Sequence, residues 1–257
     1  MQTNPLQQAI TYLLTKMADD ALILGHRNSE WTGLGPIMEE DIAFSSMAQD
    51  KIGHALGLYS ILHETYHAPD PDQYAFLREE KDYLCCHLVE LPIGEYDFSL
   101  MRHFLFDHAD ALRYEFMEKS SLEALRPLSK KLKGEIKYHT LHANAWLTQL
   151  CSAGDESYAR MQSALDYCFP LALGMFERRE EMEDRLMDEK IYPGEEQLKE
   201  AWLERIYPIL VKSSLNLPDP VNTSPINGGR HGYHTQHLQP LLNEMSAVFR
   251  LDPTAKW

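Results

Sequence analysis

Residues 36–67 read PIMEEDIAFSSMAQDKIGHALGLYSILHETYH, a long stretch with no proline after its first residue. Its length and composition predict one continuous helix. Asp50 and His54 lie four residues apart within it, so their side chains are expected on the same helix face. A carboxylate and an imidazole that share a face are the groups from which helical bundles build metal sites in their interior.

A second acid–histidine pair, Glu135 and His139, repeats this spacing in a later segment that is also expected to be helical. Bundles that bind two iron ions use Glu-x-x-His, with a spacing of three, on two of their four helices. Here the positions three residues before the histidines hold Lys51 and Ile136. The two pairs therefore come close to the di-iron motif but do not match it.

The remaining periodic segments are also helical, and short breaks rich in proline, glycine and aspartate separate them. Besides residues 36–67, we expect helices at residues 5–25, 72–88, 97–120, 121–152, 155–188, 194–213 and 235–249. The first two long helices and the next two each place acidic residues and a histidine near their middles. Long helices joined by short loops predict an all-α, ferritin-like antiparallel helical bundle with additional C-terminal helices, as a single domain over residues 1–257.

Composition excludes several classes of protein. The 257 residues carry a formal net charge of −15, which disfavours non-specific binding to nucleic acid. The four cysteines, at positions 85, 86, 151 and 168, match no zinc or disulfide spacing. The first 20 residues lack the features of a signal peptide, and no apolar run is long enough to span a membrane. We expect a soluble cytoplasmic protein.

The residues leave two interpretations of the acid–histidine pairs open. In the first, Lys51 pairs with Asp20 or Asp107, the histidines bond neighbouring carboxylates, and the site is neutral without metal. In the second, the chain is an independent di-metal oxidase with a shifted ligand set, namely Asp50, His54, Asp107, Glu135 and His139. Lys51 disfavours the second interpretation because an ammonium competes with metal ions for carboxylates.

The segment Gly228-Gly-Arg-His-Gly-Tyr-His-Thr-Gln-His237 is unusual because glycines, histidines and an arginine lead directly into the last expected helix. It is either an N-capping loop, with Thr235 as the cap, or a contact for a partner or a CoA ligand.

Several blocks of the sequence, in order, carry a resemblance to a known family. They are Ser29–Gly33, Asp41, Ala43, Asp50, Gly53 and Ala55, Glu90–Pro92 with Gly94, Glu135 with Tyr138 and His139, His234–Leu238, Pro240–Met245 and Trp257. On these blocks the chain resembles, along essentially its whole length, the structural C-type subunits of ring-1,2-phenylacetyl-CoA epoxidase from aerobic phenylacetate degradation.

This resemblance implies a role inside a multicomponent monooxygenase. In that family a related catalytic subunit holds the di-iron centre and forms a ring epoxide on phenylacetyl-CoA with O₂ and NADPH. A reductase supplies the electrons, and small accessory subunits complete the enzyme. The C-type subunit supports the catalytic subunit as a scaffold, so the resemblance implies no catalytic residue and no cofactor in this chain. A homodimer of the chain is a further arrangement that the sequence leaves open.

The resemblance also implies which positions correspond to the lost ligands. The catalytic pattern Gln-Asp-Glu-x-Gly-His aligns with Gln49–His54, which places Lys51 on a glutamate ligand and keeps His54. On the fourth long helix, Ile136 falls on the other glutamate and His139 is kept. Asp107 falls on the third helix and Asp20 on the first. The expected vestigial slots, in which no metal is expected, are Asp20, Lys51, His54, Asp107, Ile136 and His139.

Overall fold

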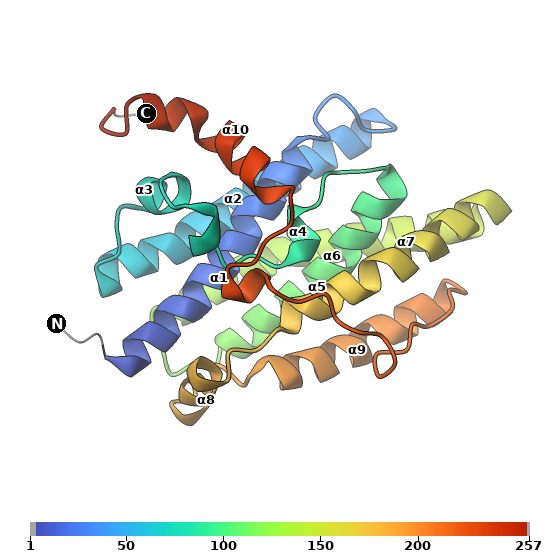
Figure 1. Ribbon diagram of the computed structural model, residues 1–257. Helices are drawn as coiled ribbons and strands as arrows, with labels where there is room; N and C mark the ends of the chain where they lie inside the picture. The colour runs from blue at the N-terminus through green and yellow to red at the C-terminus, as the bar shows by residue number, and fades with distance from the viewer. Residues whose placement is uncertain (1–3, 256–257) are drawn as a thin grey trace. The chain divides into compact units, whose positions relative to one another are not determined.

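The computed structural model describes residues 4–255, and Figure 1 shows their helices. No strand is formed within this range, which confirms the all-α class. The chain divides into two compact units, one formed by residues up to Pro92 together with those from Gly228 onward, and the other by Ile93–Asn227. The single domain expected over residues 1–257 stays a prediction, and Trp257 lies outside the described residues.

The first unit is built on a hairpin of two long helices, α1 (Pro5–Ser29) and α2 (Met38–Tyr66). Figure 1 shows them running antiparallel. Asn4 caps α1, because its side chain accepts a hydrogen bond from the Leu6 amide at 3.0 Å. The shorter elements of this unit are α3 (Pro71–Phe76), a 3₁₀ turn (Glu80–Asp82), α4 (His87–Glu90), a second 3₁₀ turn (Gly229–His231) and α10 (Leu238–Leu251).

The prediction of one continuous helix over residues 72–88 is wrong. Between α3 and α4 the chain forms a 3₁₀ turn and then a non-helical stretch at residues 83–86, in which two amides donate to buried carboxylates of α1. The Leu84 amide donates to Asp19 at 2.7 Å, and the Cys86 amide donates to Asp20 at 2.8 Å. These charge-assisted bonds are stronger than the helical bonds they replace. Tertiary contacts therefore decide the conformation of this segment.

The second unit contains a second long hairpin, α5 (Tyr96–Met117) and α6 (Leu125–Ser152). It also contains α7 (Asp155–Leu173), a 3₁₀ turn (Gly174–Phe176), α8 (Glu180–Asp188) and α9 (Glu195–Lys212). The two hairpins α1–α2 and α5–α6 each have the layout expected for one half of a duplicated ferritin-like bundle. Helices α7 to α10 are the additional C-terminal helices that the sequence predicts.

One long helix was also expected over residues 155–188, but it is broken between α7 and α8. Pro170 lies inside α7 and does not end it, while its carbonyl accepts a hydrogen bond from the Ile226 amide at 2.9 Å. A methyl group on Gly174 would lie 2.2 Å from the Ile226 carbonyl oxygen. The helix therefore ends where the loop before residue 228 packs against it, and only glycine permits this approach.

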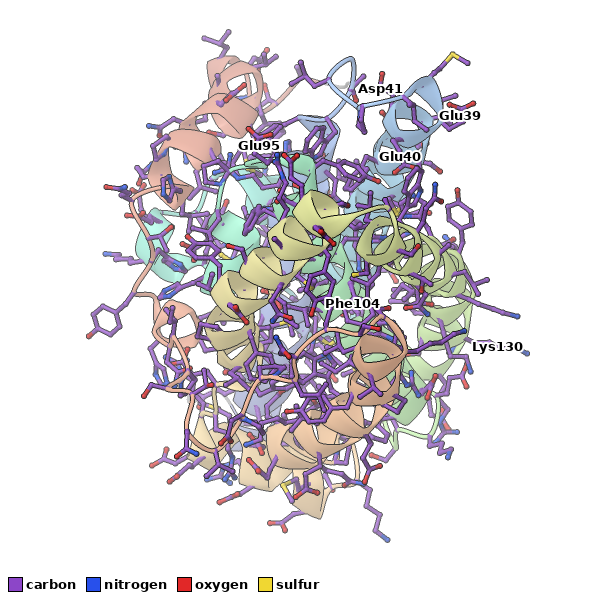
Figure 2. The ribbon with its side chains drawn as sticks, turned by 90° about the vertical axis from the view of Figure 1, so that its right-hand side faces the viewer. Glu39, Glu40, Asp41, Glu95, Phe104 and Lys130 are labelled. Carbon is purple, nitrogen blue, oxygen red and sulfur yellow. The ribbon has the colours of Figure 1, made fainter. Side chains whose placement is uncertain are left out.

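The helices carry both exposed charged side chains and a buried apolar core. Figure 2 shows Lys130 projecting outward from α6, whereas Phe104 of α5 is fully buried. It also shows Glu39, Glu40 and Asp41 together in the first turn of α2. Acidic side chains at this end of a helix interact favourably with the helix dipole and stabilise the helix. Within residues 4–255, none of the helices combines the length and the apolarity that crossing a membrane requires.

Candidate functional site

Asp20, the carboxylate expected at the helix-one slot, is held by an arginine from the far end of the chain. Arg230 donates to its two oxygens at 2.9 and 2.7 Å, and both side chains are almost fully buried. Burial alone would lower the pKa of Arg230, but the charge of Asp20, the neighbouring Cys86 and the hydrogen bonds to Asp20 together outweigh it and raise that pKa well above its ordinary value. The charge of Asp20 is therefore compensated within the first unit without a metal ion.

The neighbouring Asp19 is the centre of a second buried polar cluster. It accepts hydrogen bonds from the Tyr59 hydroxyl, from the guanidinium of Arg78 and from the Leu84 amide. Arg78 also lies 4.1 Å from the centre of the Tyr83 ring, in cation–π geometry. Burial, followed by the charge of Asp19, raises the pKa of Tyr59 well above its ordinary value, so this hydroxyl stays a donor.

Lys51 and His54 both lie on α2 and are fully buried, while Asp50 beside them is only partly buried. The structure therefore places the two slot residues in the interior, as the alignment with the di-iron motif predicts. Arg230 forms an ion pair with Asp20. The partner of Lys51 stays a prediction.

In the second unit, Asp107 lies among histidines. His103 Nδ1 is in close polar contact with Asp107, and His139 Nδ1 lies 3.8 Å from the Asp107 carboxylate. Burial lowers the pKa of His103, and the charge of Asp107 offsets this only in part. Sequence analysis missed His103, although its spacing of four from Asp107 repeats that of Asp50 and His54. Ile136 is fully buried on α6, where it contributes no ligand atom.

Glu135, a member of the shifted ligand set, lies in a different environment. Its side chain is 31% exposed and pairs with Lys131, one turn earlier on α6, at 3.8 Å. His139 and Ile136 on the same helix are fully buried. Glu135 therefore belongs to the solvent-facing side of α6, which disfavours its role as an interior metal ligand.

The donor set does not fit a di-iron centre. Such a centre needs carboxylates to balance the charge of two iron ions and imidazoles to complete their coordination. Two of the slot positions carry an ammonium and a hydrocarbon, and both side chains are fully buried. The charge of Asp20 is already neutralised by Arg230. Of the slot residues other than Asp20, only Asp107 carries a carboxylate, and one carboxylate is too few to balance the charge of two iron ions.

A separate cluster in the first unit was not predicted from the sequence. Cys85, Glu90 and His234 place one sulfur, one oxygen and one nitrogen atom within 4.8 Å of each other. The cysteine and the glutamate are fully buried, and the histidine side chain is 1% exposed. The sequence did contain a signal for this cluster, because Glu90 and His234 belong to two of the distinctive blocks, Glu90–Pro92 and His234–Leu238, which lie far apart in the sequence.

The loop before α10 is fixed to the same cluster. The Thr235 amide donates to Glu90 Oε2 at 2.7 Å, and a methyl group on Gly229 would lie 2.0 Å from the Cys85 carbonyl oxygen. Thr235 was expected to cap the last helix, but α10 begins at Leu238 and follows His237. The Thr235 hydroxyl instead accepts from the His237 amide at 3.3 Å. The loop is thus a structured part of the first unit.

Two comparisons with known proteins show what the chain is similar to. The family model described as phenylacetic acid catabolic protein matches residues 1–257. The chain is also similar to the C-type subunit of 1,2-phenylacetyl-CoA epoxidase from Escherichia coli (strain K12). The two are 29% identical over 252 residues, which cover 98% of this chain and 100% of the relative.

Proposed function

The chain belongs to the family of phenylacetic acid catabolic proteins, and from this membership we propose that it acts in phenylacetate degradation as a structural subunit of a phenylacetyl-CoA 1,2-epoxidase. The relative from Escherichia coli is a C-type subunit of such an epoxidase and matches over nearly the whole chain. We further propose that the protein is non-catalytic, cytoplasmic and free of a di-iron centre, and that it scaffolds the subunit that carries one.

The observation that carries the non-catalytic role is the complete burial of Lys51 and Ile136. If either side chain turned toward solvent, a neighbouring residue could take over its place as a ligand. Because both are buried, the interior positions that correspond to two glutamate ligands are occupied by a cation and a hydrocarbon. The Asp20–Arg230 pair adds to this argument, since a carboxylate held at both oxygens is not available to bridge metal ions.

A scaffold also needs a surface that a partner covers, and α2 offers one. Met38, Ile42, Ile52 and Leu56 are exposed, and their spacing places them along one side of the helix. Obligate interfaces are large and have apolar cores, and an exposed apolar stripe of this kind marks an interaction site. We propose that this stripe is covered by the catalytic di-iron subunit.

The remaining partners follow from the same proposal. A reductase would deliver electrons to the catalytic subunit, and small accessory subunits would complete the complex. A homodimer of this chain is the alternative occupant of the α2 stripe. A charge introduced into the stripe distinguishes the two, because Ile42→Glu would abolish either the heteromeric or the homomeric species in size-exclusion chromatography.

Iron analysis together with co-purification tests the proposed role. We expect the purified chain to hold far less than one iron per chain, to oxidise no phenylacetyl-CoA alone, and to co-elute with the catalytic subunit. About two irons per chain, as in di-iron carboxylate bundles, would reject the scaffold role and favour the independent di-metal oxidase. Iron-free protein that forms no complex with the catalytic subunit would reject both.

A double substitution tests the slot assignment itself. We expect Lys51→Glu with Ile136→Glu to raise the affinity for Fe²⁺ at least about tenfold, or about 1.4 kcal/mol, because it restores two buried carboxylates. Calorimetric titration under anaerobic conditions measures this change. The matched control is Lys131→Glu with Leu141→Glu, which adds the same charges at exposed positions of α6. An equal gain in the control, or no gain in a folded double variant, would contradict the assignment.

A further inference from the structure

We propose that Cys85, Glu90 and His234 form a binding site for a single divalent ion of the zinc type. The site lies entirely within the first unit and shares no residue with the six vestigial slots. It joins α4 and the segment before it to the loop that precedes α10. This proposal does not rest on the proposed scaffold role, because it concerns a different cluster and a different class of metal site.

The first argument is the separation of the three ligand atoms. Cys85 Sγ lies 3.7 Å from Glu90 Oε1 and 3.9 Å from His234 Nδ1, and Nδ1 lies 2.8 Å from Oε1. A point equidistant from these three atoms lies roughly 2 Å from each, close to the bond lengths that zinc forms with nitrogen, oxygen and sulfur. The three side chains therefore surround a position of ionic size without rearrangement of the backbone.

The second argument is the orientation of the histidine. His234 Nε2 lies 3.0 Å from the Tyr83 carbonyl oxygen, an acceptor to which only a protonated nitrogen can bond. Without metal, Nδ1 shares a proton with Glu90 Oε1 at 2.8 Å; when that proton is lost, the lone pair of Nδ1 faces Cys85 and Glu90. In metal sites, the ring nitrogen that does not bind the ion commonly donates a hydrogen bond to a carbonyl, which fixes the tautomer of the histidine.

The third argument is the orientation of the carboxylate. Glu90 Oε2 accepts a hydrogen bond from the Thr235 amide at 2.7 Å, which leaves Oε1 directed at the cysteine and the histidine. Two of the three ligands are thus held by backbone groups of Tyr83 and Thr235. These hydrogen bonds fix the orientation of the two side chains, as the outer partners of metal ligands do.

Charge and ligand chemistry indicate the class of ion. A thiolate, a carboxylate and a neutral imidazole carry two negative charges, which one divalent cation neutralises in a buried site. A sulfur ligand selects zinc over magnesium or calcium. On binding, the Cys85 S–H bond and the His234 Nδ1–H bond that faces Glu90 break, both protons leave to solvent, and sulfur–metal and nitrogen–metal bonds form. A water molecule would complete the coordination, as in three-ligand zinc sites.

The ion would act as a structural clamp. His234 is separated from Glu90 by 144 residues, and the first unit includes both ends of the chain. A metal bond between them would fasten the loop at Gly228–His237 to α4 and the segment before it. Because an ion that binds only the folded state stabilises it, the first unit would depend on zinc for part of its stability.

Cobalt substitution tests the site with the full chain. After chelation and dialysis, Co²⁺ is added, and the thiolate-to-cobalt charge-transfer band in the near ultraviolet is recorded with the bound cobalt. We expect about one cobalt per chain at a three-ligand site of this kind. The band should be absent in Cys85→Ser and retained in Cys151→Ser, whose partly exposed thiol lies outside the cluster. No band in the unmodified chain would overturn the proposal.

A second measurement covers the case in which Cys85→Ser does not fold. Zn²⁺ is expected to slow alkylation of Cys85 in the unmodified chain at least about tenfold, a protection that His234→Gln removes. Equal alkylation rates with and without zinc would show that the cluster is only a Glu90–His234 ion pair with a neighbouring thiol. Neither readout involves iron or complex formation, so failure here is distinguishable from failure of the scaffold role.

Discussion

Arg230→Met is expected to lower the free energy of unfolding by about 3–5 kcal/mol, because it leaves the buried Asp20 carboxylate without its cation. Arg230 is fully buried and donates to both oxygens of Asp20 and to the Leu84 carbonyl. Methionine has a similar length, so the loss reports the charge and the hydrogen bonds more than the volume. Urea unfolding followed by circular dichroism measures it.

Two controls isolate the buried ion pair. Arg160→Met removes an exposed arginine that pairs with Asp97 and Glu95, and exposed pairs contribute little, so no measurable loss is expected. Adding Asp20→Leu to Arg230→Met should recover part of the loss, because the unpaired charge is removed. If Arg230→Met costs no more than Arg160→Met, the ion pair does not hold the loop before α10 in place.

Trp202→Ala is expected to destabilise the second unit by about 3–5 kcal/mol, the cost of a large cavity in a core. Trp202 of α9 is fully buried and packs between Phe169 and Phe176, with ring centroids 5.9 and 5.1 Å from its own. Its indole nitrogen donates to the Leu105 carbonyl of α5 at 2.9 Å. Thermal and urea unfolding of the variant measure the loss.

Trp202→Phe separates the contribution of the ring from that of the hydrogen bond. It retains most of the apolar volume and loses the N–H donor, so a smaller cost of about 1–3 kcal/mol is expected. Trp146→Ala is the matched control, because Trp146 is only partly buried and meets Tyr96 edge-on. An equal cost for Trp202→Ala and Trp146→Ala would contradict the role of Trp202 as the core of this unit.

Periodicity located most of the helices but not all of their ends. The cores of α1, α2, α5, α6 and α9 match the expected segments, because each carries a long apolar pattern whose period does not depend on its neighbours. The helices expected over 72–88 and 155–188 are broken where other segments compete for their backbone. Asp19 and Asp20 accept hydrogen bonds from the amides of Leu84 and Cys86. The Ile226 amide donates a hydrogen bond to the carbonyl of Pro170.

The amino-acid sequence alone was sufficient to establish the all-α class and the family, while its assignment of the slot residues stays a prediction. These depend on local periodicity and on the order of distinctive blocks along the chain. The tertiary structure decided which charges meet, because Arg230 lies 210 residues from Asp20 and His234 lies 144 residues from Glu90. No local pattern encodes such pairs. They form because a buried charge is stable only beside a partner, and folding alone determines which partner comes within reach.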